Sequence, residues 1–164
     1  MAEEISRAGG SVREDRGLDQ IDREILRLLA DNGRLSYAKL SAAVALSANA
    51  VAERVRRLAD DGVITGVHAA VDPGALGRPL TALIDVRLTP SGTPDQLEQA
   101  AAAIDGIQEI AFLTGRFDFQ LRAACRDSAD LDRLLRELRA TTEVAETETR
   151  LVLRDLLRRT LPVT

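Results

Sequence analysis

Apolar side chains recur at helical spacing through the first part of the chain. Ile21, Ile25 and Leu28 fall on one face of a helix expected over residues 18–31. Aspartates at positions 19 and 22 suit the positively polarised start of such a helix. The pattern therefore predicts a first helix with one buried side.

Two shorter helices are expected next, joined by a tight turn. Ser36 and Ser47 each precede a helical pattern, where a hydroxyl can accept a hydrogen bond from a free backbone N–H. Gly62 suits the left-handed residue that ends many helices. The expected apolar faces are Leu40 and Val44 in one helix, and Val51, Val55 and Leu58 in the next. The three helices predict a helix-turn-helix unit over residues 18–66.

The segment that follows this unit predicts a β-wing. Residues 63–67 are β-prone, and we expect them to pair with residues 68–72. The N-terminal unit is therefore expected to be a winged helix-turn-helix.

The third helix also has a polar face. If this face is exposed, it can enter the DNA major groove. We expect Ala48, Asn49 and Glu53 to face bases and Arg56 to contact phosphate, whereas Arg54 lies beside the apolar stripe. Arg54 is expected to pair with an acid of the core such as Asp22, or to reach a phosphate. The full set of expected DNA-binding residues is Ser36, Ser47, Ala48, Asn49, Ala52, Glu53, Arg54, Arg56 and Arg57. The alternative is a merely solvated polar face, or a three-helix module that docks protein.

The second half of the chain changes to strand periodicity. Residues 72–79 are rich in glycine and proline and predict a hinge. Alternation then predicts strands at 80–88, 107–114, 117–123 and 144–153, and helical spacing predicts helices near 93–104 and around the leucines at 131–138. The order βαββαβ is that of a ferredoxin-like sheet covered by two helices on one face. We expect its other face to carry apolar positions that support self-association.

These patterns predict an α+β protein with a division into segments. Residues 1–17 are expected to form a flexible arm, 18–66 the winged helix-turn-helix, 67–79 a linker or hinge strand, and 80–164 the ferredoxin-like domain for effector binding and oligomerisation.

Charge and composition narrow the function classes. The 164 residues carry a net charge of −4, but three arginines against one glutamate between Ser47 and Leu58 predict a locally cationic helix. One such helix makes few phosphate contacts, so a dimer or larger assembly is the expected DNA-binding form. Aromatic residues at 2% provide no platform for stacking single-stranded bases.

Cys125 is the only cysteine and His68 the only histidine of the chain. This excludes an intrachain disulfide and a Cys/His zinc cluster. We expect no metal and no cofactor. No apolar run approaches the ~20 residues of a membrane span, and the first 17 residues show no signal-peptide pattern, so we expect a cytoplasmic protein without membrane contact.

Several segments in this order resemble the Lrp/AsnC family, the feast/famine regulators of bacteria and archaea. They are residues 18–23, 46–58, 62–64 and the Thr-Gly-Arg-Phe-Asp run at 114–118. The resemblance implies a DNA-binding transcriptional regulator with a C-terminal RAM domain, which pairs protomers into homodimers and often assembles dimers into octamers. It also implies amino acids as effectors.

The resemblance further implies an effector site at the 114–118 turn. The implied residues are Thr114, Gly115, Arg116, Phe117 and Asp118. Independently, a glycine turn exposes backbone N–H groups to a carboxylate, and Asp118 could accept from an α-ammonium. The alternative is a hairpin turn in which Gly115 only permits the bend and Asp118 only faces solvent.

Two other functions stay open at this point. One is an architectural DNA-compacting protein that binds many sites with little sequence preference. The other is an enzyme, since the family fold also resembles the sirohaem decarboxylases, but such haem chemistry depends on histidines and His68 is the only one.

Overall fold

The computed structural model describes residues 17–141 and 143–155. These residues form two compact units, one within residues 17–70 and one within residues 71–155. The expected N-terminal arm, apart from Gly17, and residues 156–164 of the expected C-terminal domain lie outside the described residues.

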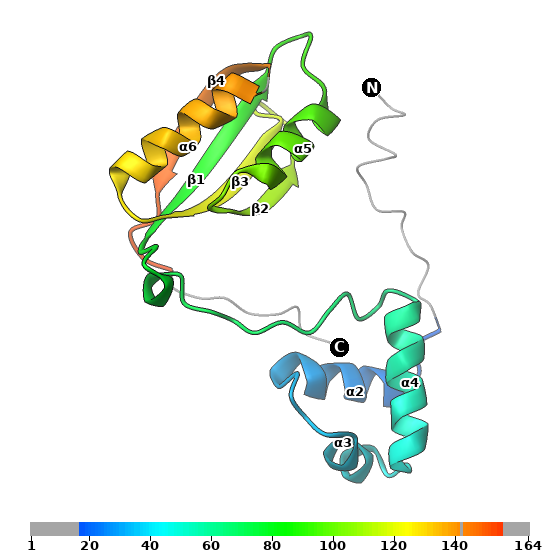
Figure 1. The fold of residues 1–164 in the computed structure, drawn as a ribbon. Helices are drawn as coiled ribbons and strands as arrows, with labels where there is room; N and C mark the ends of the chain where they lie inside the picture. The colour runs from blue at the N-terminus through cyan, green and yellow to red at the C-terminus, as the bar shows by residue number, and fades with distance from the viewer. Residues whose placement is uncertain (1–16, 142, 156–164) are drawn as a thin grey trace. The chain divides into compact units, whose positions relative to one another are not determined.

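Three helices build the first unit, labelled in Figure 1 as α2 (Gln20–Asp31), α3 (Tyr37–Val44) and α4 (Ala48–Asp60). The expected serine caps are present: Ser36 Oγ accepts from the Lys39 N–H at 3.3 Å, and Ser47 Oγ accepts from the Ala50 N–H at 3.2 Å. Each cap satisfies a backbone donor that a helix start would otherwise leave free. The buried centre of this unit consists of Ile25, Leu40, Val51 and Leu58.

A left-handed residue follows each of the helices α3 and α4. Ala45, which caps the end of α3, has φ 54°, and Gly62, just after α4, has φ 66°. The Leu58 carbonyl accepts from the N–H groups of Val63 at 2.8 Å and Ile64 at 3.0 Å. The prediction of a left-handed glycine at the helix end is confirmed.

The prediction that residues 63–67 pair with residues 68–72 as strands of a β-wing is wrong. Residues 63–72 contain no strand, and Val67 and Val71 are exposed. The His68 ring folds back over the Cα of Gly66, against the space that a side chain there would fill. Since Gly66 also has no side chain for a cross-strand contact, this run lacks the pairs that hold a hairpin.

The second unit is a four-stranded antiparallel sheet with two helices. Its elements are η1 (Gly74–Leu76), β1 (Leu80–Leu88), α5 (Pro94–Ala103), β2 (Ile107–Phe112), β3 (Phe119–Cys125), α6 (Ser128–Thr141) and β4 (Val144–Leu151). The strand order is β2-β3-β1-β4, and each neighbouring pair is antiparallel. This confirms the βαββαβ prediction, although β3 begins two residues later than expected and β2 and β4 end two residues earlier.

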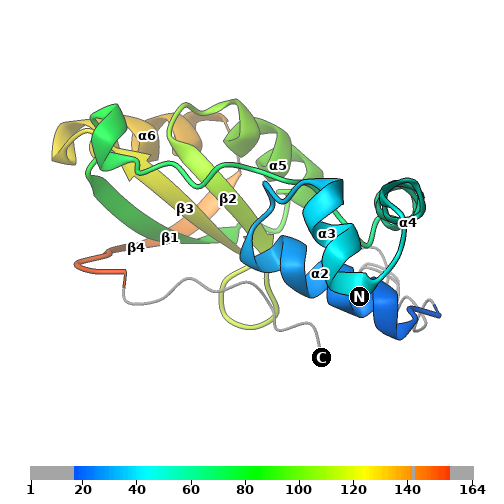
Figure 2. The ribbon, with the colours of Figure 1, turned by 90° about the horizontal axis from the view of Figure 1, so that it is seen from below.

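Both helices lie on one face of the sheet, as two views at right angles show (Figures 1 and 2). Alternate residues of β1, namely Ala82, Ile84 and Val86, are fully buried on that side and pack with Leu97 of α5 and Leu134 of α6. The alternation predicted for this strand is therefore confirmed.

The other face of the sheet is mostly polar, which corrects the expectation of apolar outer positions. The residues that alternate with the core there include Asp85, Arg87, Gln120, Arg122, Glu148 and Arg150. Asp85 is buried between its neighbours, accepting from Gln120 Nε2 at 2.9 Å and pairing with Arg150. The alternation predicted which residues share this face, but polar side chains occupy most of it.

In the described part of the chain, no helix has the length and apolar character needed to cross a membrane.

Candidate DNA-binding surface and effector turn

Helix α4 presents one polar side and buries the other. Val51 and Leu58 are buried, while Asn49, Glu53 and Arg56 are exposed. Ala48 is exposed and Ala52 half-buried at the capped end of the helix. The side chains expected to face bases therefore share an accessible surface.

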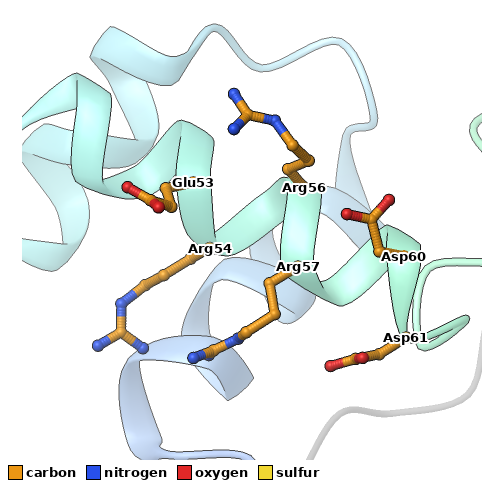
Figure 3. A pocket seen from close by; sticks show the side chains of 6 residues that line it. All are labelled: Glu53, Arg54, Arg56, Arg57, Asp60 and Asp61. Atoms are coloured by element: carbon orange, nitrogen blue, oxygen red, sulfur yellow. The ribbon is translucent and has the colours of Figure 1, made fainter.

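Two arginines of α4 are held by acids at the start of α2. Arg54 Nη1 lies 2.6 Å from Asp19 Oδ2 and 2.8 Å from Asp22 Oδ1, and Arg57 Nη2 lies 2.8 Å from Asp22 Oδ2. In Figure 3 both guanidiniums extend to the same side of α4, and Arg56 extends away from them. The predicted pairing of Arg54 with Asp22 is confirmed; the sequence analysis did not foresee that Arg57 joins it.

Asp19 both caps α2 and binds Arg54. Its carboxylate accepts from the Asp22 N–H at 2.7 Å. This backbone hydrogen bond, with a smaller effect from Arg54, lowers the pKa of Asp19 below its ordinary value. The hydrogen bonds that Arg54 donates to Asp19 and Asp22 raise the pKa of Arg54 in turn. Each group therefore stabilises the charged form of the other.

These pairs reduce the positive charge that α4 offers to DNA. A shallow depression of about 600 Å³ beside the helix is lined by three arginines and three acids: Glu53, Arg54, Arg56, Arg57, Asp60 and Asp61 (Figure 3). Since Asp19 and Asp22 neutralise two of the arginines, Arg56 is the cation of α4 that makes no ion pair within residues 17–141 and 143–155. The local positive charge predicted for this helix is therefore smaller than its three arginines indicate.

The expected effector turn connects β2 to β3. Thr114, Gly115 and Arg116 are exposed, whereas Phe117 and Asp118 are half-buried. Gly115 has φ 122°, a conformation that favours glycine. The turn therefore presents its first three residues to solvent.

Asp118 fastens the turn to the neighbouring strand. Its Oδ2 accepts from the Leu88 N–H at 2.7 Å, its N–H donates to the Val86 carbonyl at 2.9 Å, and its carbonyl accepts from the Leu113 N–H at 2.7 Å. Oδ2 of this carboxylate is thus engaged, and Oδ1 accepts from no donor among the described residues. The arrangement suits an ammonium group beside a fixed carboxylate.

Two charged residues beside this turn were not among the expected site residues. These residues are Glu146 and Arg87: Glu146 contacts Arg87 Nη2 at 2.6 Å and Arg116 Nη2 at 2.7 Å. Arg87 and Glu146 belong to strands that neighbour the turn only in the folded sheet. Because they are far from the turn along the chain, the sequence did not indicate them.

The residues that could hold a metal are not brought together. No group of three or more histidine, cysteine, aspartate or glutamate side chains in the described ranges is arranged around a common point. Cys125 is buried, and burial raises the pKa of its thiol. His68 is exposed in the segment after the helical unit.

Comparison with known proteins matches each unit to a family model. The model described as "Winged helix-turn-helix DNA-binding" matches residues 18–65, and the model described as "Lrp/AsnC ligand binding domain" matches residues 81–162. The HTH-type transcriptional regulator AldR of Mycobacterium tuberculosis is 38% identical over 85% of this chain and 79% of its own length. The leucine-responsive regulatory protein of Haemophilus influenzae is 36% identical over 82% of this chain and 81% of its own.

Solved structures share the fold. The leucine response regulatory protein LrpA of Mycobacterium tuberculosis superposes with a TM-score of 0.80 at 30% identity, covering 88% of this chain and 99% of that one. A transcriptional regulator of Neisseria meningitidis, solved as a complex with L-methionine, has a TM-score of 0.80 at 27% identity and covers 89% of this chain and 97% of its own.

Proposed function

Because this chain belongs to the Lrp/AsnC family of DNA-binding transcriptional regulators, we propose that it binds DNA sequence-specifically and that a small effector, of the amino-acid class, controls its activity or assembly. The observation that carries the proposal is the accessible polar face of α4, held by capped helices against a buried core. Such a helix can lie in the major groove with its first turn near the base edges.

The surroundings of each residue indicate whether it is suited to contact a base or a phosphate. Asn49 and Glu53 are exposed near the start of α4 and suit base edges, where an amide can read adenine and a carboxylate can accept from cytosine. Ala48 and Ala52 let the helix approach closely. Arg56 suits phosphate. Arg54 and Arg57 hold α4 against α2 through Asp19 and Asp22, and we expect their remaining N–H donors to reach phosphates. The Ser36 and Ser47 hydroxyls cap helices whose N-termini would approach the DNA backbone.

The effector part of the proposal rests on the 114–118 turn. Thr114, Gly115 and Arg116 are exposed beside a fixed Asp118 carboxylate, a combination suited to a zwitterion. The Neisseria meningitidis regulator of the same fold was solved with L-methionine, which supports an amino-acid ligand as the class to test.

The DNA-binding form is proposed to be a homodimer, with a tetramer of dimers as the larger assembly. The part of the open sheet face around Leu83, in the middle of β1 and away from Arg87 at its end, is the surface proposed for pairing. Since one α4 offers few free cations, two or more copies are needed for a tight complex.

The test is a DNA titration at fixed salt with DNA from upstream of the chain's own gene and with random DNA of the same length, repeated with each amino acid. We expect preference for the upstream DNA and a shift of affinity with one amino acid. Binding without a shift would contradict effector control, and absent binding would contradict the DNA role.

Equal affinity for both DNAs would instead favour the architectural alternative. The enzyme alternative is not retained, because the similar curated proteins are named as transcriptional regulators with a DNA-binding domain.

A further inference from the structure

The corner of the sheet beside the effector turn holds a carboxylate shared by two guanidiniums. Arg87 at the end of β1 stands opposite Glu146 of β4 in the strand register, and Arg116 reaches Glu146 from the turn. Both oxygens of Glu146 are used: Oε2 lies 2.6 Å from Arg87, and Oε1 lies 2.7 Å from Arg116.

Acceptors at this corner are occupied, whereas donors are in excess. Asp118 Oδ2 accepts from the Leu88 N–H, and Glu146 serves two arginines. Each guanidinium has several N–H donors and uses only one nitrogen toward Glu146; neither Arg87 nor Arg116 has another acceptor among the described residues. A ligand that matches this corner must bring acceptor oxygens.

Glu146 does not close the corner to a second anion. The Arg116 side chain is 65% exposed, and its guanidinium lies over the Phe117 ring at 4.9 Å from the centroid, which keeps it beside the turn. Because both arginines of this ion pair are exposed to water, a ligand carboxylate can join Glu146 at the two guanidiniums.

We propose that this corner selects an acidic amino acid as the effector, an inference that rests on the proposed effector role of the 114–118 turn. The free oxygen of Asp118 receives the α-ammonium, and the exposed backbone around Gly115 receives the α-carboxylate. Arg87 and Arg116 receive the side-chain carboxylate, which an uncharged amino acid lacks. Charge-assisted pairs to guanidinium are the strong and orienting kind.

The competing interpretation is purely structural: Arg116 only ties the turn to β4 through Glu146. This interpretation predicts that Arg116 affects stability but not the choice between ligands of equal size and different charge.

The experiment is calorimetric titration of the full chain with two matched pairs, L-glutamate against L-glutamine and L-aspartate against L-asparagine. We expect at least one acidic member to bind about tenfold or more tightly than its amide, since one such pair is lost in the amide. Because Arg87 still faces the ligand, Arg116→Gln should reduce this preference, weakening the binding of the acidic ligand more than that of its amide. Glu146→Gln should increase the affinity for the acidic ligand, because it removes the competing carboxylate.

The matched control is Arg136→Gln on α6, an exposed arginine paired with Asp132 in the same unit, which should change neither affinity. Equal affinity for acid and amide, tight binding of an uncharged amino acid alone, or a preference that Arg116→Gln leaves unchanged would overturn this inference and leave the proposed function standing. The proposed function is tested separately by Asp118→Asn, which should weaken every amino acid that binds. If no amino acid binds at all, the proposed effector role and this inference fail together.

Discussion

Asp22 is 1% exposed and binds Arg54 and Arg57 with separate oxygens, so removal of either arginine leaves a buried acceptor underused. We expect Arg54→Ala to lower the free energy of unfolding by about 1–3 kcal/mol, the cost of a poorly satisfied buried polar group. Urea unfolding followed by circular dichroism would measure it.

The matched control for that change is Arg56→Ala on the same helix, since Arg56 is exposed and makes no ion pair among the described residues. It should alter stability by no more than about 0.5 kcal/mol. Equal destabilisation by both changes would contradict the division between holding and exposed arginines.

Substitutions of the exposed residues of α4 should have different effects on DNA binding, depending on whether the residue contacts phosphate or a base. Arg56→Ala should weaken binding to all sequences alike and reduce the salt dependence, whereas Asn49→Ala should weaken preferred sites by about 1–3 kcal/mol and relax base choice. Titrations on preferred and random DNA at several salt concentrations give both quantities. Uniform losses for both variants would refute separate phosphate and base contacts.

The lowered pKa of Asp19 makes the first unit sensitive to acid. The folded carboxyl holds its proton less tightly than the unfolded one, so the unfolded state binds more protons in acid. The stability from ionised Asp19 is therefore complete above its ordinary pKa of about 3.8 and is lost as the pH falls through the lower folded value. Asp19→Asn, which keeps a capping side chain, should make the acid decline of stability shallower in unfolding curves between neutral pH and about pH 2.

At the scale of elements, the end of α4 depends on one backbone conformation. Gly62 at φ 66° turns the chain so that Leu58 accepts two backbone N–H groups. Gly62→Ala should cost about 1–2 kcal/mol, because an L side chain is strained there. Gly62→Asn is the control, since asparagine tolerates the left-handed region, and it should cost clearly less in the same unfolding assay.

Elements whose signals are local could be predicted from the sequence. The serine caps of α3 and α4, Gly62 and the alternation of β1 each depend on neighbouring residues, and all four are confirmed. The wing could not be predicted reliably, because a strand needs a partner and residues 63–72 have none in the described chain.

In the candidate sites too, local features could be predicted from the sequence and contacts between distant residues could not. Arg54 was expected to pair because its place on the helical wheel is a local property. The joining of Arg57 to Asp22, and of Arg87 and Arg116 to Glu146, depends on which surfaces pack together. Periodicity indicates that a residue faces a surface, but it does not indicate which charged group lies opposite.

At the scale of the whole molecule, a substitution on the polar open face of the sheet can test how the chain assembles. Leu83 lies on that face between the cross-strand partners Arg122 and Arg150. Arg122 and Arg150 are already paired with Asp155 and Asp85, so Leu83→Arg should add an uncompensated guanidinium to this face. It should shift the chain toward monomer in light scattering and lower the salt dependence of DNA binding by about half, because fewer phosphates are contacted per complex. Gln99→Arg on the exposed side of α5 is the control and should leave the assembly unchanged. An unaltered molecular mass for Leu83→Arg would exclude this face as the pairing surface.

The place of β1 between β3 and β4 also sets an order of events during synthesis. The helices of the first unit contact partners close in sequence, so this half can fold as soon as it leaves the ribosome. In contrast, β1 pairs over residues 82–88 with β4, which is made only after β2, β3 and α6. A nascent chain therefore carries a completed DNA-binding half while its central strand still lacks one neighbour, and chaperones or premature association would act on that unfinished sheet.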